Sequence, residues 1–189
     1  MNGQASKPIK NLNQLIPLAV IGAGLIILGL LAVVILASNN YSGDLSVVPS
    51  EVNFPAPDLT LNDLQGEKVS ISEYRQQIVL INNWATWCPP CKAEMPTLSK
   101  YFMEHHDQGF TLIGINAGDP LDEVVNFVDE YDLPFPILLD PNNKSLIAFR
   151  NDTLPSSYVI DQNGNVVLAW TGPISRAILE KYITPLLEQ

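Results

Sequence analysis

An uninterrupted apolar run near the N-terminus constrains this chain more than any other feature of its sequence. Residues 15 to 37 read LIPLAVIGAGLIILGLLAVVILA, a run of 23 residues with no charged side chain. At 1.5 Å per residue, a helix of this length can cross a hydrocarbon core about 30 Å thick. The sequence therefore predicts one transmembrane helix over residues 15–37.

The charges on either side of the run predict its orientation. Lys7 and Lys10 precede it without an acidic neighbour, whereas Asp44 and Glu51 follow it. Positively charged flanks favour the cytoplasmic side of a membrane. We therefore expect residues 1–14 in the cytoplasm and everything after the helix on the outer side, which makes this a single-pass cell-membrane protein with an extracytoplasmic domain.

A cleaved signal peptide is the alternative interpretation of the same run. Such a peptide has an apolar region of about 7 to 15 residues and ends in small residues at its cleavage site. The run here is longer, and Ile35 or Leu36 would occupy the small-residue position. These features favour an anchor that stays attached, and a mature N-terminus near Ser38 would show the opposite.

Composition limits the partners and sites that the rest of the chain can have. The chain has 189 residues, 47% of them hydrophobic, which suits one domain of ordinary size after the apolar run. Its 10 basic and 20 acidic residues argue against nucleic acid as a partner, because phosphate binding needs clustered cations. Its two cysteines exclude a disulfide-dense scaffold and a four-cysteine zinc site. We expect a polar linker over 38–54 and a folded domain over 55–189.

Apolar segments after residue 55 alternate between strand-like and helix-like spacing, which predicts an α/β domain with a mixed sheet. The expected strands are 58–61, 68–71, 78–83, 110–116, 136–139, 157–160 and 166–170, and the expected helices are 91–105, 119–131, 143–149 and 175–187.

Two closely spaced thiols indicate redox chemistry. The segment WATWCPPCK, residues 84–92, places Cys88 and Cys91 between an apolar strand and a helix. At the first turn of a helix, free backbone N–H groups and the positive end of the dipole favour a thiolate, so we expect Cys88 to be the nucleophile. Cys91, one turn further on, is expected to lie deeper and to resolve a mixed disulfide. A static disulfide or half of a zinc site is the alternative.

The run NNWATWCPPCKAEMP and the preceding APDLTLNDLQGEKVSISEYRQQIVLIN resemble the membrane-anchored, thioredoxin-like thiol-disulfide oxidoreductases of the TlpA and ResA kind, which have a redoxin or AhpC-TSA-type domain. The likeness runs from about residue 55 to the C-terminus. It implies a thioredoxin-like fold with an N-terminal β-hairpin extension and a central helix-strand insertion, here at 119–139.

The resemblance also implies roles for single residues. In the segment TLPSSYVID, Pro155 occupies the position of a cis-proline that faces the dithiol, so the Leu154 backbone is expected to pair with an extended substrate. Independently of the resemblance, two positions of a strand-to-helix turn cannot both face inward, so Trp87 is expected to form an exposed apolar rim for substrate and Trp84 to pack under the loop. Core filling by both is the alternative. Glu94 resembles a glutamate that moves protons to or from the second cysteine, the alternative being an exposed glutamate paired with a lysine. Asn83 departs from the family, which usually has an aromatic or aliphatic residue there.

The function that the resemblance implies is reduction of protein disulfides outside the cytoplasm, with apocytochrome c as a substrate class. Electrons would come from a membrane thiol relay protein, because the chain has no nicotinamide or flavin motif; we expect no cofactor beyond the Cys88–Cys91 disulfide, and no metal. Copper delivery and thiol oxidation on the same fold are the alternatives. Related copper carriers space their thiols one residue wider and add a distal histidine, and this chain has neither. The residues leave the direction of electron flow open.

Overall fold

A computed structural model of the protein describes residues 24–33 and 47–188. The chain divides into two units, 1–44 and 45–189. In the first unit, residues 24–33 form a helix with exposed side chains. Among the residues that the structure describes, no helix has both the length and the apolarity needed to cross a bilayer. Because 1–23 and 34–46 lie outside the described residues, the transmembrane helix over 15–37 stays a prediction.

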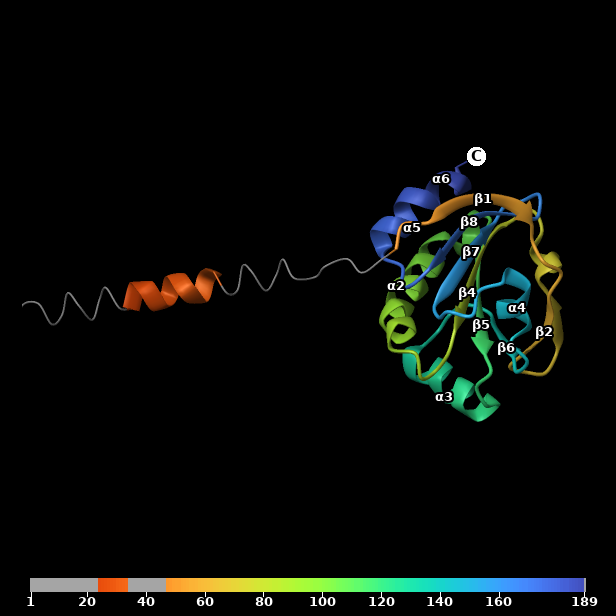
Figure 1. Ribbon diagram of the computed structural model, residues 1–189, viewed down its shortest axis with the longest axis horizontal. Coiled ribbons are helices and arrows are strands. Elements are labelled where there is room, and N and C mark those ends of the chain that lie inside the picture. The colour runs from red at the N-terminus through yellow and green to blue at the C-terminus, as the bar shows by residue number, and fades with distance from the viewer. Residues whose placement is uncertain (1–23, 34–46, 189) are drawn as a thin grey trace, which may run out of the picture. The chain divides into compact units, whose positions relative to one another are not determined.

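The second unit is built on a sheet of eight strands in the order β1-β8-β7-β4-β5-β6-β2-β3 (Figure 1). Strands β4, β5 and β6 are parallel to one another, and every other neighbouring pair is antiparallel. The strands are β1 (Ser50–Pro55), β2 (Thr60–Asp63), β3 (Lys68–Ser70), β4 (Ile78–Trp84), β5 (Phe110–Ala117), β6 (Ile137–Asp140), β7 (Ser156–Ile160) and β8 (Asn165–Thr171). The mixed sheet expected from the sequence is therefore present.

Helices cover the two faces of this sheet unequally. The helices are α2 (Pro89–His105), α3 (Leu121–Tyr131), α4 (Lys144–Phe149), α5 (Arg176–Tyr182) and α6 (Thr184–Leu187), with short 3-10 turns η1 (Ile71–Tyr74) and η2 (His106–Gln108). Buried side chains of α2, α3 and α5 form the larger core on one face. Side chains of η1, of the β2–β3 hairpin and of α4 pack on the other face.

Strand β4 lies at the centre of this arrangement, and all seven of its residues are buried. Its side chains alternate between the two cores, with Leu80 on the α2 side and Ile81 on the η1 side. A strand covered on both faces has a nearly continuous apolar sequence, as β4 does until its last three residues. Those residues, Asn82, Asn83 and Trp84, lead directly into the cysteine loop.

The structure corrects two expectations from the sequence. Residues 50–54 were assigned to the linker, but Ser50–Pro55 is strand β1, which pairs with the edge of β8. The closing helix expected over 175–187 is divided into α5 and α6 near Ile183. Pro185 explains the division, because a proline has no N–H for the helical bond to the preceding turn.

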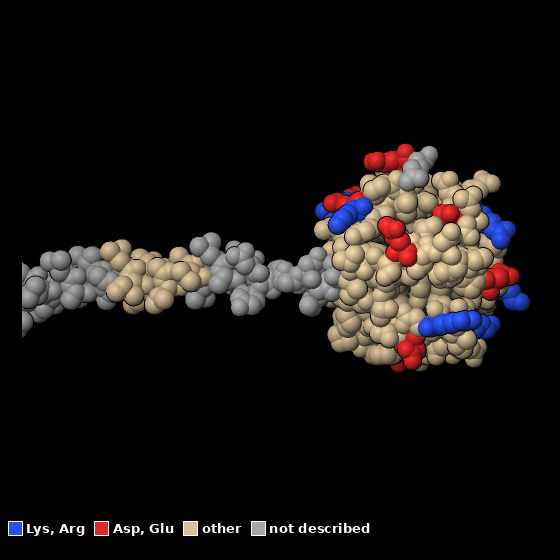
Figure 2. Space-filling model, turned by 45° about the horizontal axis from the view of Figure 1, so that its top comes forward, with Lys and Arg blue, Asp and Glu red and all other residues tan. Residues whose placement is uncertain are grey.

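Charged side chains are spread over the surface of the folded unit. On the face in Figure 2, acidic and basic side chains are interspersed, several of them next to one another, and the basic side chains do not gather into one patch.

Candidate active site

The cysteine loop joins the end of β4 to the start of α2. Cys88 is the N-cap of α2, and its sulfur accepts a hydrogen bond from the Cys91 backbone N–H at 3.3 Å. Pro89 follows at the first helical position, where its fixed φ suits a helix and its missing N–H leaves no donor unpaired. The sequence therefore places Cys88 at the positive end of the helix dipole, as its spacing predicted.

Cys88 and Cys91 form a disulfide whose Cα atoms are 5.3 Å apart. Cys91 is fully buried, and Cys88 retains an exposed fraction of 3%. Both cysteines are therefore buried, and Cys88 is the more exposed of the two, which is the order expected of a nucleophile and a resolving thiol.

The two tryptophans of the loop lie as the sequence predicted. Trp87, next to Cys88, has 67% of its surface exposed. Trp84 is fully buried and packs against Phe127 of α3, with ring centroids 4.6 Å apart. Trp87 thus gives the dithiol an exposed apolar neighbour, while Trp84 supports the loop from below.

The loop before β7 contains the expected cis peptide bond, between Leu154 and Pro155. In the antiparallel pair of β4 and β7, Ser156 lies opposite Asn83. Pro155 therefore enters the sheet at the end from which the cysteine loop leaves. Within the described chain, the Leu154 N–H and C=O make no backbone hydrogen bond, so both groups are free to pair with an extended segment.

An open groove of about 750 Å³ connects Trp87 with this cis-proline loop. The groove is lined by Trp87 and Leu154 and by residues of α4 and of the segment that follows it, among them Leu146, Ile147 and Arg150. Ile147 is 71% exposed. The groove therefore offers apolar surface beside the dithiol.

Glu94 lies on α2 one turn after Cys91 and is 2% exposed. Its two carboxyl oxygens accept hydrogen bonds from Asn82 Nδ2 at 2.8 Å and from the Ile174 backbone N–H at 2.9 Å. Burial raises the pKa of Glu94 to about 7, and these two bonds oppose the rise because they favour the ionised form. The alternative of an exposed glutamate paired with a lysine is therefore wrong.

One residue of this site was missed by the sequence reasoning. The Asp119 carboxylate, just before α3, accepts hydrogen bonds from the Thr86 backbone N–H at 2.6 Å and from Asn116 Nδ2 at 2.8 Å. Asp119 therefore holds the loop that carries Cys88. The sequence signal was its position at the start of the expected insertion, but nothing local linked it to a loop 33 residues earlier.

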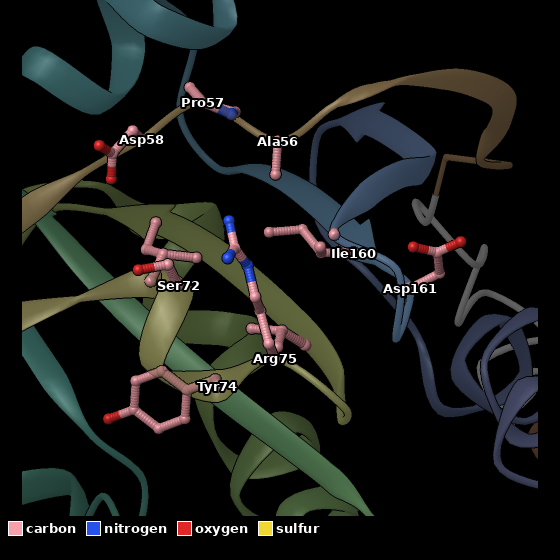
Figure 3. A pocket seen from close by; sticks show the side chains of 11 residues that line it. Ala56, Pro57, Asp58, Ser72, Tyr74, Arg75, Ile160 and Asp161 are labelled. Carbon is pink, nitrogen blue, oxygen red and sulfur yellow. The ribbon is translucent and has the colours of Figure 1, made fainter.

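A second cavity, of about 200 Å³, lies near the opposite end of β4, beside Val79. Figure 3 shows the Arg75 side chain extending between Ser72 and Ile160 on the wall of this cavity. No cysteine lines it. It is therefore separate from the dithiol site.

Within 24–33 and 47–188, no group of three or more His, Cys, Asp or Glu side chains lies close enough to hold a metal ion.

Comparison with known proteins identifies the family. The AhpC/TSA family model matches residues 52–169. The chain belongs to the AhpC/TSA family. A relative within it, the thiol-disulfide oxidoreductase ResA of Geobacillus kaustophilus, is 35% identical over 132 residues, which are 70% of this chain and 76% of the relative. The ResA of Halalkalibacterium halodurans is 35% identical over 128 residues, 68% of this chain and 73% of that one. The chain is thus a ResA-like thiol-disulfide oxidoreductase of the thioredoxin family.

Solved structures bear out the thioredoxin-like fold. The thiol:disulfide interchange protein from Chlorobium tepidum, a thioredoxin family protein, superimposes with a TM-score of 0.65 at 28% identity, covering 73% of this chain and 99% of that one. A secreted thiol-disulfide isomerase from Corynebacterium glutamicum, at 22% identity, shares the fold with a TM-score of 0.69 over 79% of this chain and 96% of that one.

Proposed function

We propose that this oxidoreductase is a membrane-anchored reductase of protein disulfides that works on the outer side of the cytoplasmic membrane. The observation that carries the proposal is the groove lined by both Trp87, which is next to Cys88 at the N-terminus of α2, and Leu154 of the cis-Pro155 bond. A disulfide-bonded protein segment can pair with the Leu154 backbone and so bring one of its sulfurs to Cys88.

The reaction needs only the two cysteines and the substrate. In the reduced enzyme, the Cys88 thiolate attacks one substrate sulfur, the substrate S–S bond breaks, and the other substrate sulfur leaves and takes up a proton. The Cys91 thiolate then attacks Cys88 Sγ, which forms the Cys88–Cys91 disulfide and releases the second substrate thiol. Two electrons pass from the enzyme dithiol to the substrate. Because both thiols are on one helix turn, the second step is intramolecular and fast.

Glu94 is the proposed proton acceptor for the Cys91 thiol. A pKa of about 7 lets its carboxyl gain and lose a proton near neutral pH, which is the range where a general acid or base works best. Its place one turn after Cys91 puts it on the same side of α2.

The partners follow from the proposed location. The family resemblance supports apocytochrome c as a substrate class, because its haem-attachment cysteines must be reduced before thioether bonds form. An anchored outer domain does not meet cytoplasmic thiol donors, so a membrane thiol relay protein is the proposed source of electrons.

Cysteine variants test the mechanism. In reduction of insulin or of a disulfide-bonded peptide by the full chain in detergent, Cys88→Ser should abolish turnover. Cys91→Ser should accumulate a mixed disulfide between Cys88 and the substrate, visible as an added mass on denaturing, non-reducing analysis. Normal turnover by Cys88→Ser would overturn the proposal.

A redox titration tests the direction of electron flow. Equilibration with glutathione or dithiothreitol buffers should give a reduction potential well below about −200 mV for a reductase. A potential near about −120 mV, typical of a strong oxidant, would reverse the assignment to thiol oxidation.

A further inference from the structure

Asn83 is a fully buried amide in the strand that leads to the dithiol. A buried amide is costly unless its donor and acceptor are both bonded. Its Nδ2 donates to Ser156 Oγ at 3.2 Å, and its Oδ1 accepts a hydrogen bond from Ser145 Oγ at 2.6 Å. Ser145 and Ser156 are themselves fully buried. Asn83 therefore ties β4 to two other elements, α4 through Ser145 and β7 through Ser156.

The same network extends to the start of α4. The Asp140 carboxylate, 1% exposed at the end of β6, accepts the Ser145 backbone N–H at 2.7 Å and the Lys144 backbone N–H at 2.9 Å. The N-terminal turn of α4 is thus held from two directions, by a carboxylate on its backbone and by Asn83 on the Ser145 hydroxyl.

The two partners of Asn83 are close in sequence to residues that line the groove. Ser156 follows the cis-Pro155 bond, two residues after Leu154. Ser145 precedes Leu146 and Ile147, which line the groove from α4. Ser145 and Ser156 do not line the groove themselves. Any effect of these serines on substrate binding must therefore be transmitted through the position of the walls.

The neighbouring amide, Asn82, has different partners on the other face of the strand. Its Nδ2 donates to Glu94 at 2.8 Å and to Ser157 Oγ at 3.0 Å. Because consecutive strand residues point to opposite faces, Asn82 faces the proton-carrying glutamate and Asn83 faces the supports of the groove. The adjacent serines of β7 thus belong to separate networks.

We propose that Asn83 is a positioning residue for substrate, which sets the spacing between α4 and the cis-Pro155 loop and so fixes the groove for an extended protein segment. This inference rests on the proposed function. The segment lies with its backbone along Leu154 and an apolar side chain against Ile147, next to the cysteine that Cys88 attacks. The groove takes this occupant because it is continuous with Trp87 and the cis-proline loop.

Serine variants test the proposal in the full chain in detergent, with a disulfide-bonded peptide as substrate. Ser145→Ala and Ser156→Ala should each raise KM for the peptide about tenfold, equivalent to about 1.4 kcal/mol, while kcat stays within about twofold. The ratio of kcat/KM for the peptide to kcat/KM for oxidised glutathione should fall by a similar factor, because glutathione is too short to fill the groove. Ser156→Thr, which keeps the hydroxyl, should restore KM.

Two controls make the test specific. Ser99→Ala makes the same chemical change on α2, where the Ser99 hydroxyl is buried without a hydrogen-bond partner within the described part of the chain, and should leave KM unchanged. Ser157→Ala should shift the pH dependence of turnover through Asn82 and Glu94 and change KM much less than Ser156→Ala does.

Wild-type KM in Ser145→Ala, with turnover that still requires Cys88, would overturn this inference and leave the proposed function intact. A fall in kcat by the same factor as the rise in KM in the serine variants, together with a loss of folding stability, would also overturn it. That result would describe a purely structural network. Turnover that no longer requires Cys88 would instead refute the proposed function.

Discussion

At the scale of single residues, Glu94 shows how burial sets the chemistry of this site. Its carboxyl lies in a nearly water-free region, and only the Asn82 amide and the Ile174 N–H stabilise its charge. The ionised form therefore costs free energy in the folded protein, and this cost is what raises the pKa to about 7. If Glu94 carries protons as proposed, its raised pKa near neutral pH comes with a loss of folding stability.

This cost predicts how stability depends on pH. Below about pH 4.5 the Glu94 carboxyl is protonated in both folded and unfolded chains. Between about pH 4.5 and 7 only the folded state retains the proton, so the free energy of unfolding should fall as pH rises, by about 3 kcal/mol in total. In urea unfolding of the oxidised protein from pH 4 to 8, Glu94→Gln should remove this part of the pH dependence.

Glu130→Gln, on the exposed side of α3, is the matched control and should keep the wild-type pH dependence. If Glu94→Gln and the wild type lost stability in parallel between pH 5 and 7, the raised pKa would be wrong. The slope of stability against pH is compared, and not stability at one pH. A glutamine cannot accept hydrogen bonds from both N–H donors that face Glu94, so Glu94→Gln also changes stability in a way that does not depend on pH.

Sequence reasoning reached some of these residues and not others for a physical reason. Cys88 and Cys91 are three apart, so their geometry follows from a single helix turn. The burial of Glu94 depends on Asn82, 12 residues away, and on Ile174, 80 residues away. No local pattern contains the second contact, and the sequence left the role of Glu94 open.

At the scale of elements, the central insertion supports the cysteine loop as well as adding to the sheet. Helix α3 and β6 fill the predicted region at 119–139, and the Asp119 carboxylate at its start binds the Thr86 backbone N–H. The loop that presents Cys88 is therefore held by an element that comes later in the chain, since Asp119 follows Thr86 by 33 residues.

Removing that carboxylate should loosen the loop. Asp119→Ala loses the bonds to Thr86 and Asn116 and should cost about 2 kcal/mol in the free energy of unfolding, because hydrogen bonds to charged groups are the stronger kind. Hydrogen exchange at the Thr86 amide should speed up, as measured by NMR. Asp119→Asn keeps one acceptor oxygen and should lose less, while unchanged Thr86 protection in Asp119→Ala would contradict the prediction.

Elements were predicted well where their sequence is continuously apolar or periodic, and poorly where it is neither. The apolar strands β4 and β5 appear in the sequence as continuous runs, because both of their faces are covered. Strand β1 lies at the edge of the sheet, with five of its six residues exposed and an irregularity in its pairing between Glu51 and Phe54. Such a strand has no apolar alternation to detect, so it was taken for linker.

At the scale of the whole molecule, the folded unit 45–189 contains the complete dithiol site. All of the residues assigned to catalysis, to substrate binding or to positioning the substrate lie between Asn83 and Ser156, and the support from Ile174 lies in the same unit. The apolar run over 15–37 contributes none of them. Its proposed role is therefore to hold the active site at the outer surface of the membrane, near a relay protein in the same bilayer.

Location can be tested without any assay of activity. The full chain should sediment with membranes and resist carbonate extraction, and protease added to spheroplasts should degrade its C-terminal unit, whereas a chain beginning at Leu45 should be released in soluble form.

A double variant, Leu28→Arg with Leu31→Arg, places two charges near the centre of the run, where each costs about 3 kcal/mol of insertion free energy. This variant should lose membrane retention. The mass of the mature protein separates the two modes of targeting, because a chain that begins near Ser38 would mean that the run is removed. Sedimentation of the double variant with membranes, equal to that of the wild type, would show that something other than the apolar run holds the protein there.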